Sequence, residues 1–411
     1  MRQVYYGWYV VAITIVIFMV LVGSIFSAFG VFVLPVSAEL GLSRATMNTA
    51  IGLVSVGNAI LAPFVGWLLD RIAAKLVMIV CSIVYGASML TLGFSHSLWL
   101  SGLTLTLGIP LAYLGAGSLS ATLLIARWFT ARRGRAMMLA GLGLSAGSLI
   151  SPPTIGMLVE ANGWRRSLLL LGTALGALLT ILAVIVRERP GPNDVELAAQ
   201  PLPTPSSGQE GRAVPAPMKV LAMLRMPQFW TASISTAVAM GAFTTIVVSL
   251  VPLARAHGFG MLEATGLISI MGAAAIVGAL LLAPIADRVD RILLLSGLFL
   301  LGVPVNVVLL SGYRYLVLVT AAIILGIATG TATPTFYSIL ADRFRTSSFG
   351  TVRGLSFFLI GVFGVLELHF GGALFDKTGN YRATFLAAIV LAVASAALMF
   401  TTRFTRRDTE R

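Results

Sequence analysis

The loop GWLLDRIAAK, residues 66–75, has a counterpart in APIADRVDR, residues 283–291. The Asp-Arg pair at positions 70 and 71 recurs at 287 and 288, an offset of 217 residues. Loop glycines repeat in the same way, with Gly134 matched by Gly350 and Gly163 by Gly379 at an offset of 216. Apolar runs resemble one another by chance, but charges and glycines at corresponding turns do not. The chain is therefore predicted to contain two related halves.

The composition indicates a protein surrounded by lipid. Hydrophobic residues make up 58% of the 411 positions and charged residues 10%, whereas a soluble domain carries about 25% charged residues. A membrane-crossing helix needs roughly 20 apolar residues, and twelve stretches qualify. They are residues 9–34, 46–69, 76–95, 98–124, 135–158 and 167–186, then 228–254, 262–286, 292–311, 315–340, 352–374 and 383–402. The first stretch is too long for the apolar core of a cleavable signal peptide, so we expect it to be retained as span 1.

Six spans in each half give both copies the same orientation, which predicts parallel repeats about an axis along the membrane normal. The expected fold is an all-α membrane protein with twelve transmembrane helices in two six-helix bundles. We predict an N-terminal bundle at 1–187, a linker at 188–226 and a C-terminal bundle at 227–411. The linker contains QPLPTPSSGQEGRAVPAP, and such a sequence, rich in proline, glycine and serine, is expected to be flexible.

The positions of the basic residues predict the orientation in the membrane. With the N-terminus inside, 21 of the 28 Lys and Arg residues fall on the cytoplasmic side, Arg353 at the start of span 11 among them. Both termini are thus expected in the cytoplasm, with the chain in the cell (inner) membrane. This asymmetry accounts for the net charge of +13 without a nucleic-acid partner.

Enzymatic and metal chemistry find little support in the sequence. Cys81 is the only cysteine, and His96, His257 and His369 are far apart, so neither a metal site nor a cofactor is expected. We find no paired acids, no nucleophile–base pair and no phosphate-binding G-x-x-x-x-G-K-[ST] loop. The chain is expected not to be an enzyme or an ATP-driven pump.

The two Asp-Arg loops have the properties of a cytoplasmic latch. An aspartate at this position can face the positive N-terminal end of a helix in the other half, and the basic residues can pair with acids or lipid headgroups. Such contacts would hold one closed state and break in the other. The alternative is that these residues only obey the positive-inside rule. The gate candidates are Gly66, Asp70, Arg71, Lys75, Arg127, Asp287, Arg288 and Arg343.

Both loops resemble the signature G-x-x-x-D-R-x-G-R/K of the major facilitator superfamily, with departures at Ala73 and Ala283. The stretch RWFTARRGRAMMLAGLGLSAG, residues 127–147, resembles the span 4–5 motif of the monocarboxylate porter and oxalate–formate antiporter branch. YYGWYVV at 5–11, MPQFW at 226–230 and GGALFDKTGNYRATF at 371–385 are similar to other motifs of that branch. The resemblance implies a secondary transporter that works by alternating access.

The substrate implied by this branch is less straightforward. Its carboxylate carriers typically place a basic residue in span 8, and some add one in span 11, but the matching positions here are Ala279 and Gly361. We expect no Lys or Arg in the core of any span. Because a buried anion without a cationic partner is costly, a neutral molecule, a protonated acid or a cation fits this interior better than a carboxylate anion.

One ionisable residue, Glu367, falls inside a span, in the outer third of span 11. An acid at that depth is a candidate for proton coupling or for a cation site, although near the outer surface it could simply be hydrated. Polar and aromatic groups at mid-span depth are candidates to line a solute cavity, since the resemblance implies that spans 1, 4, 7 and 10 do so; the alternative is that they only join helices. The cavity candidates are Phe26, Phe29, Asn58, Tyr113, Thr244, Thr245, Asn306 and Tyr337.

The leading hypothesis is a monomeric secondary transporter that moves a small organic solute, monocarboxylate-like or weakly acidic, with protons or another coupling ion. A proton-linked exporter of apolar or cationic compounds is the alternative within transport. A membrane sensor that binds without transporting is an alternative of a different class.

Overall fold

The computed structural model describes residues 5–42, 44–191, 194, 196, 218–344 and 346–404, and every regular element among them is helical. The first half contains α1 (Gly7–Val22), η1 (Gly23–Ser27), α2 (Phe29–Leu40), α3 (Arg44–Leu69), α4 (Ala74–Phe94), α5 (Leu98–Leu103), η2 (Thr104–Gly108), α6 (Ile109–Ala112), η3 (Tyr113–Ser118), α7 (Leu119–Trp128) and α8 (Arg133–Ile185). The second half contains α9 (Val220–Leu224), α10 (Pro227–Ala256), α11 (Met261–Leu282), α12 (Arg291–Leu300), α13 (Gly302–Ser311), α14 (Tyr315–Arg343), η4 (Thr346–Ser348), α15 (Phe349–Thr378), α16 (Arg382–Thr401) and η5 (Thr402–Phe404).

Within the described residues, 11 helical stretches are long and apolar enough to cross a membrane. One of them, α8, has 53 residues and is interrupted at Gly163, whose φ of 74° and ψ of 161° are not helical. α8 therefore comprises two spans joined by a sharp turn, and the twelve-span all-α fold predicted from the sequence is confirmed. Gly379, at the matching turn of the second half, ends α15 with a φ of 67°. Glycine adopts such positive φ values without the steric cost that other residues incur.

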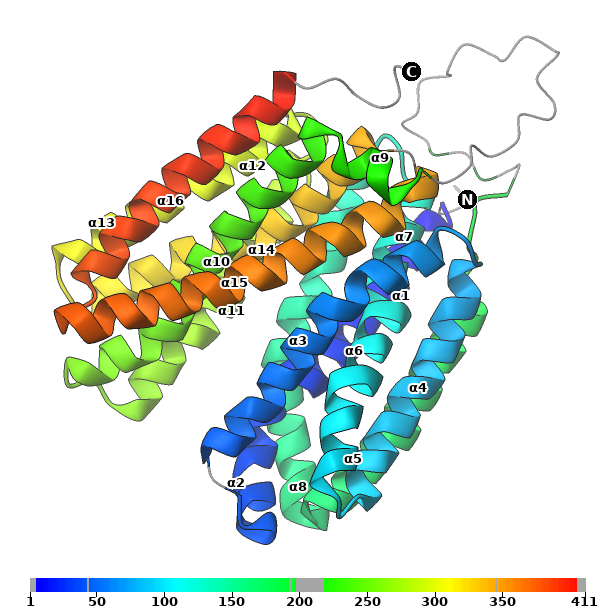
Figure 1. Cartoon of the computed structure of the whole chain (residues 1–411), viewed down its shortest axis with the longest axis horizontal. Coiled ribbons are helices and arrows are strands. Elements are labelled where there is room, and N and C mark those ends of the chain that lie inside the picture. The colour runs from blue at the N-terminus through cyan, green and yellow to red at the C-terminus, as the bar shows by residue number, and fades with distance from the viewer. Residues whose placement is uncertain are drawn as a thin grey trace.

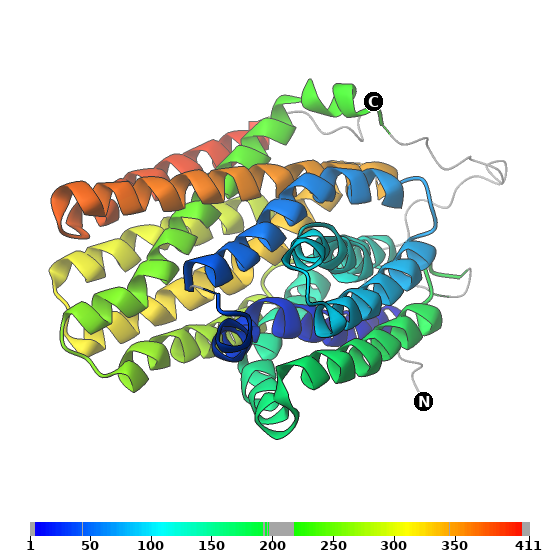
Figure 2. The same ribbon diagram turned by 60° about the horizontal axis from the view of Figure 1, so that its bottom comes forward.

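The helices form two bundles (Figure 1), α1 to α8 in one and α10 to α16 in the other. The bundles approach each other at the end of the molecule that carries α9, and they diverge toward the opposite end (Figures 1 and 2). We call these the linker-side end and the far end. The domain boundaries at 188 and 226 stay a prediction, since most of the linker lies outside the described residues.

Small residues allow close packing inside each bundle. A Cβ atom on Gly143 would lie 2.3 Å from the Ile15 carbonyl oxygen, and one on Gly147 would lie 2.5 Å from that of Met19. Only glycine permits α8 and α1 to approach so closely. These two glycines belong to the motif at residues 127–147.

A second row of glycines forms the seam between the bundles, where α3 and α15 cross. A Cβ on Gly66 would lie 2.1 Å from the Gly350 carbonyl oxygen, and one on Gly354 would lie 2.2 Å from that of Ala62. The seam reaches Gly361, whose added Cβ would lie 3.0 Å from the Ala59 side chain. One turn further along this face of α15, Val365 is 61% exposed, so the close contact ends about halfway along the helices.

Candidate functional site

An aspartate at the linker-side end caps a helix of the other bundle. The Asp70 carboxylate accepts the backbone N–H of Gly350 at 2.8 Å and that of Thr351 at 2.7 Å, in the first turn of α15. Burial raises the pKa of Asp70 to about 6, although the hydrogen bonds from Thr351 and Gly350 and the nearby Arg127 oppose this shift. A carboxylate at a helix N-terminus is stabilised by the free N–H groups and the helix dipole. This contact holds α3 against α15.

The same arrangement occurs a second time, with the bundles exchanged. Asp287 accepts the backbone N–H of Gly134 at 2.8 Å and that of Arg135 at 3.2 Å, at the start of α8. The partners follow the offsets of the sequence repeat, 217 residues between the aspartates and 216 between the glycines. We call these two contacts the latches.

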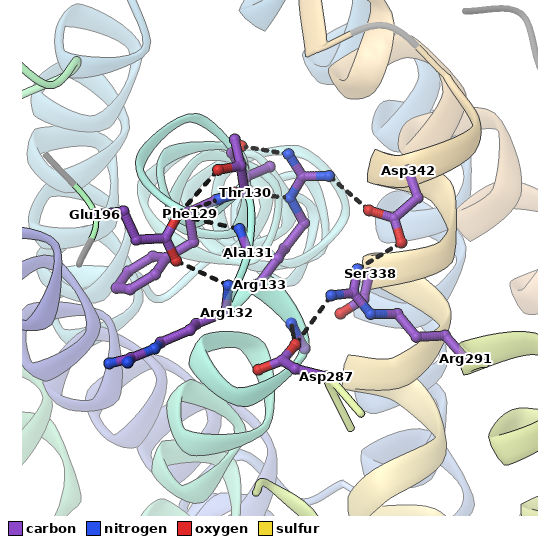
Figure 3. Close-up of polar contacts among 12 residues, drawn as sticks. Phe129, Thr130, Ala131, Arg132, Arg133, Glu196, Asp287, Arg291, Ser338 and Asp342 are labelled. Carbon is purple, nitrogen blue, oxygen red and sulfur yellow. Dashed lines mark hydrogen bonds and ion pairs between the residues drawn. The ribbon is translucent and has the colours of Figure 1, made fainter. Parts of the chain in front are cut away.

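Figure 3 shows a charge network beside the second latch. Arg133 of the N-terminal bundle donates to Asp342 of the C-terminal bundle at 2.8 Å. Arg291 also binds Asp342, and it binds Asp287 at 2.9 Å. None of Arg133, Arg291 and Asp342 was a candidate from the sequence, because each one is a loop or helix-end charge that the positive-inside rule or simple hydration explains.

The N-terminal bundle also binds residues that follow it. The Glu196 carboxylate, 8% exposed, accepts the backbone N–H groups of Thr130, Ala131 and Arg132 (Figure 3). Burial opposes ionisation of Glu196, but these backbone donors outweigh it and lower its pKa. Glu196, within the predicted linker, is therefore docked on the turn that precedes α8.

The other gate candidates lie near the first latch or at the helix ends. Arg127 forms an ion pair with Glu188, which also accepts the backbone N–H of Ala74 at 3.1 Å. The Arg71 guanidinium stacks over the Trp67 ring, with its Cζ atom 4.1 Å from the ring centroid. Arg343 is buried, Lys75 is half-buried and Arg288 is exposed.

A third contact between the bundles lies deeper, at Arg353 on α15. Its guanidinium donates to the Ser118 carbonyl and to the Thr122 hydroxyl, and Nη2 lies 3.2 Å from the Ser118 hydroxyl. The guanidinium also stacks on Tyr337 of α14, 3.8 Å from the ring centroid. Arg353 is only 1% exposed. The expectation of a core without Lys or Arg is therefore wrong: Arg353 begins at the linker-side end of α15, but its long side chain extends into the seam instead of toward water.

Aromatic candidates gather on the far-end side of Arg353. Phe26 packs edge-on against Tyr113 with ring centroids 5.2 Å apart, and Tyr113 lies within electrostatic range of Arg353 and Tyr337. Phe26 belongs to η1 and Tyr113 to η3, which are π-helical turns. Such turns occur often at functional sites.

Glu367 lies inside the C-terminal bundle rather than between the bundles. Its carboxyl group abuts Gly241 of α10, where an added Cβ would lie 2.8 Å from the carboxyl carbon. A small cavity beside it is lined by Thr245 of α10 and Thr384 of α16. In the described part of the chain, Oε2 of Glu367 is buried without a hydrogen-bond partner.

The remaining cavity candidates are dispersed. Asn306 is buried in the C-terminal bundle, where its side-chain amide donates to the Gly302 carbonyl at 2.7 Å. Thr245 faces Glu367 in the same bundle. Neither position is the central cavity that was expected for these two residues. Thr244 is exposed and donates to the Met240 carbonyl at 2.8 Å. Asn58 is 3% exposed, and Phe29 lines a mainly apolar cavity of about 430 Å³ inside the far half of the N-terminal bundle.

Two parallel helical bundles, joined at one end by paired helix-capping latches, define a polytopic membrane transport protein. The model of the Major Facilitator Superfamily matches residues 12–368, and the chain belongs to that superfamily.

Relatives are similar over most of the chain. An uncharacterized MFS-type transporter of Bacillus subtilis, YcxA, is 25% identical over 405 residues, 95% of this chain and 94% of its own. Monocarboxylate transporter 13 of Rattus norvegicus is 25% identical over 96% of this chain and 89% of its own. Monocarboxylate transporter 12-B of Danio rerio is 25% identical over 86% of this chain and 78% of its own.

Solved structures show the same fold. The human organic anion transporter MFSD10 superposes with a TM-score of 0.74 at 16% identity, over 96% of this chain and 99% of that one. The Escherichia coli fucose:proton symporter FucP superposes with a TM-score of 0.72 at 15% identity, over 98% of this chain and 100% of that one. These proteins are transporters and not enzymes, as the sequence predicted for this chain.

Proposed function

We propose that this protein is a secondary active transporter that carries a small, weakly acidic organic solute together with protons, by alternating access. The solute is monocarboxylate-like, the membrane is the cell (inner) membrane, and both termini face the cytoplasm. The linker-side latches then form the cytoplasmic gate, closed in this state, and the far end opens toward the outside.

The observation that carries the proposal is the pair of latches at one end of two bundles that diverge at the other. Each latch joins an aspartate of one bundle to backbone N–H groups of the other. Hydrogen bonds of this kind are strong when closed but need no covalent change to open. Breaking both latches would let the linker-side ends separate while the far ends come together.

Relatives support the choice of solute. Two of those described above carry the name monocarboxylate transporter, and a probable sulfoacetate transporter of Cupriavidus necator is 28% identical over 37% of this chain. These names have in common a small organic acid that is anionic at neutral pH. A small organic acid is therefore the first class of solute to test.

Glu367 is the proposed proton carrier. Its Oε2 has no hydrogen-bond partner in the described structure, and an ionisable group in the apolar part of a membrane helix is costly unless it has a function. Proton uptake by Glu367 would neutralise the carboxylate before the bundles rearrange. Its place on α15, facing α10 and α16, would couple its charge to the packing of the C-terminal bundle.

An exporter of apolar or cationic compounds is the second candidate. The apolar cavity of about 430 Å³ around Phe29 has the volume of a site for a hydrophobic molecule, and Glu367 could then balance a cation. A membrane sensor would bind a ligand without moving it.

Purified protein in proteoliposomes separates these possibilities. Uptake of labelled lactate, pyruvate and acetate is measured with and without a pH gradient, beside the neutral analogue lactamide and the cation tetraphenylphosphonium. The proposal expects uptake of an acid that rises when the lumen is alkaline. Transport of the cation alone would favour the exporter, and acid binding without uptake would favour the sensor.

A further inference from the structure

Arg353 carries a buried charge that this chain does not neutralise. A guanidinium stays protonated in proteins, and a buried charge is costly unless it is paired. Ser118 and Thr122 offer Arg353 only neutral oxygens. Among the residues that the structure describes, no carboxylate lies within ion-pair distance of Arg353.

Arg353 also keeps an unused donor. Its Nε is buried and has no hydrogen-bond partner in the described part of the chain. The guanidinium is a planar fork of five N–H donors, two of which fit the oxygens of one carboxylate. An anion that binds through Nε and Nη2 would satisfy the free donor and balance the charge in one step.

Two of the aromatic side chains near this guanidinium are only partly buried. Tyr337, which covers the guanidinium face, is itself half-buried. Tyr113 is half-buried as well and packs against Phe26. Movement of the Tyr337 ring would uncover the face of the guanidinium on which it stacks.

We propose that Arg353 binds the anionic oxygens of the transported solute through Nε and Nη2, and that the solute replaces the Ser118 hydroxyl as the partner of Nη2. This inference rests on the proposed function and gives that function its substrate site. The site differs in position from Ala279 and Gly361, where a cation was sought from the sequence. The ligand class is a small oxyanion, a carboxylate or a sulfonate.

The exchange of partners has a consequence for gating. In the empty state Arg353 of the C-terminal bundle is tied to η3 and α7 of the N-terminal bundle. An anion on Nε and Nη2 would remove the bond to the Ser118 hydroxyl and leave Nη1 bound to the Ser118 carbonyl and the Thr122 hydroxyl. Solute binding would therefore remove one of the three hydrogen bonds by which Arg353 joins the two bundles.

The test compares ligand affinity in four forms of the full-length protein reconstituted in nanodiscs. They are the wild type, Arg353→Gln, Ser118→Ala, and Arg225→Gln as a matched control that removes an exposed charge at the same end. Affinities for lactate, pyruvate, acetate and sulfoacetate are measured by calorimetry, with lactamide as the neutral reference. We expect Arg353→Gln to weaken binding of the anions at least tenfold and Arg225→Gln to leave it unchanged.

Ser118→Ala distinguishes a binding role from a structural one. Alanine keeps the backbone carbonyl that accepts from Nη1 but lacks the hydroxyl that accepts from Nη2, so the anion meets less competition and should bind several-fold more tightly. Unchanged or weaker binding in Ser118→Ala would overturn the exchange, even if Arg353→Gln fails to fold.

Measurements of anion uptake distinguish failure of this inference from failure of the proposed function. Equal anion uptake by the wild type and Arg353→Gln would contradict the site and leave the function standing. Absence of both binding and uptake of every acid by the folded wild type would contradict both.

Discussion

Asp70 and Gly350 belong to different bundles, and the carboxylate of Asp70 accepts the Gly350 backbone N–H at 2.8 Å. Asp287 and Gly134 repeat this relationship at the same distance with the bundles exchanged. Residues that are repeated in the sequence therefore make equivalent contacts across the interface between the bundles. The gate role of both aspartates is a prediction that three experiments below address directly or through the seam.

Replacing Asp70 by Asn should open the linker-side end more often. The two oxygens of Asp70 each accept one backbone N–H, and asparagine places an amide donor where one of these acceptors lay. Cysteine probes introduced at the linker-side and far ends, in a Cys81→Ala background, would report accessibility to a membrane-impermeant maleimide. Asp287→Asn should act in the same direction. Identical labelling before and after both changes would count against the latches.

The first latch should also respond to pH. Burial in the closed state raises the pKa of Asp70 from 3.8 to about 6, so the closed state binds the proton more tightly than an open state with a hydrated carboxyl group. Linkage then predicts that the closed state loses stability as pH rises from about 4 to about 6, and changes little above that.

Arg127 is the charged group that opposes the rise in the pKa of Asp70, and Arg71, Glu188 and Arg189 line the same hollow. The same labelling assay between pH 4 and pH 8 measures the effect. Asp70→Asn should flatten the profile in that range, and a profile that keeps its shape would assign the titration to another group.

The glycines of the seam should tolerate no larger side chain. A Cβ on Gly66 or Gly354 would lie within 2.2 Å of a backbone oxygen of the other bundle, and overpacking of this kind costs about 1–3 kcal/mol. Gly66→Val should therefore disfavour the closed state and reduce transport while leaving the helix content by circular dichroism unchanged. Gly364→Ala is the matched control, since nothing lies within 4 Å of its added Cβ. Full activity of Gly66→Val would mean that the seam need not close.

Glu367→Gln should abolish the dependence of uptake on a pH gradient while leaving exchange of solute across the membrane. Glutamine keeps the size and polarity of the protonated acid but cannot release a proton. Proton movement is followed with a pH-sensitive dye in the lumen during solute uptake. Glu160→Gln, at an exposed position on α8, is the control. Proton coupling that survives Glu367→Gln would remove this residue from the mechanism.

Much of the fold follows from sequence because its causes are local. Spans are apolar over the length needed to cross a bilayer, and the turns at Gly163 and Gly379 require residues that accept positive φ. The repeated Asp-Arg loops located the latch aspartates in the chain. Their partners at Gly134 and Gly350 also appeared in the repeat, although as matched glycines rather than as hydrogen-bond donors.

The orientation of side chains around each span could not be predicted. These helices are apolar on all sides, so the pattern does not tell which face meets the other bundle. Asn306 and Thr245 consequently lie inside the C-terminal bundle. Arg353 was assigned to the cytoplasmic surface because it is in the first turns of its span, and only the tertiary register with Ser118 and Thr122 reveals that it is buried.

The most direct test of proton-coupled transport of a small organic acid is uptake of labelled monocarboxylate into proteoliposomes under an imposed pH gradient. We predict accumulation above that of empty liposomes when the lumen is alkaline, loss of accumulation when the gradient is collapsed with a protonophore, and no accumulation of lactamide. Uptake of every acid at the level of empty liposomes, by protein whose helix content and orientation are verified, would contradict the account.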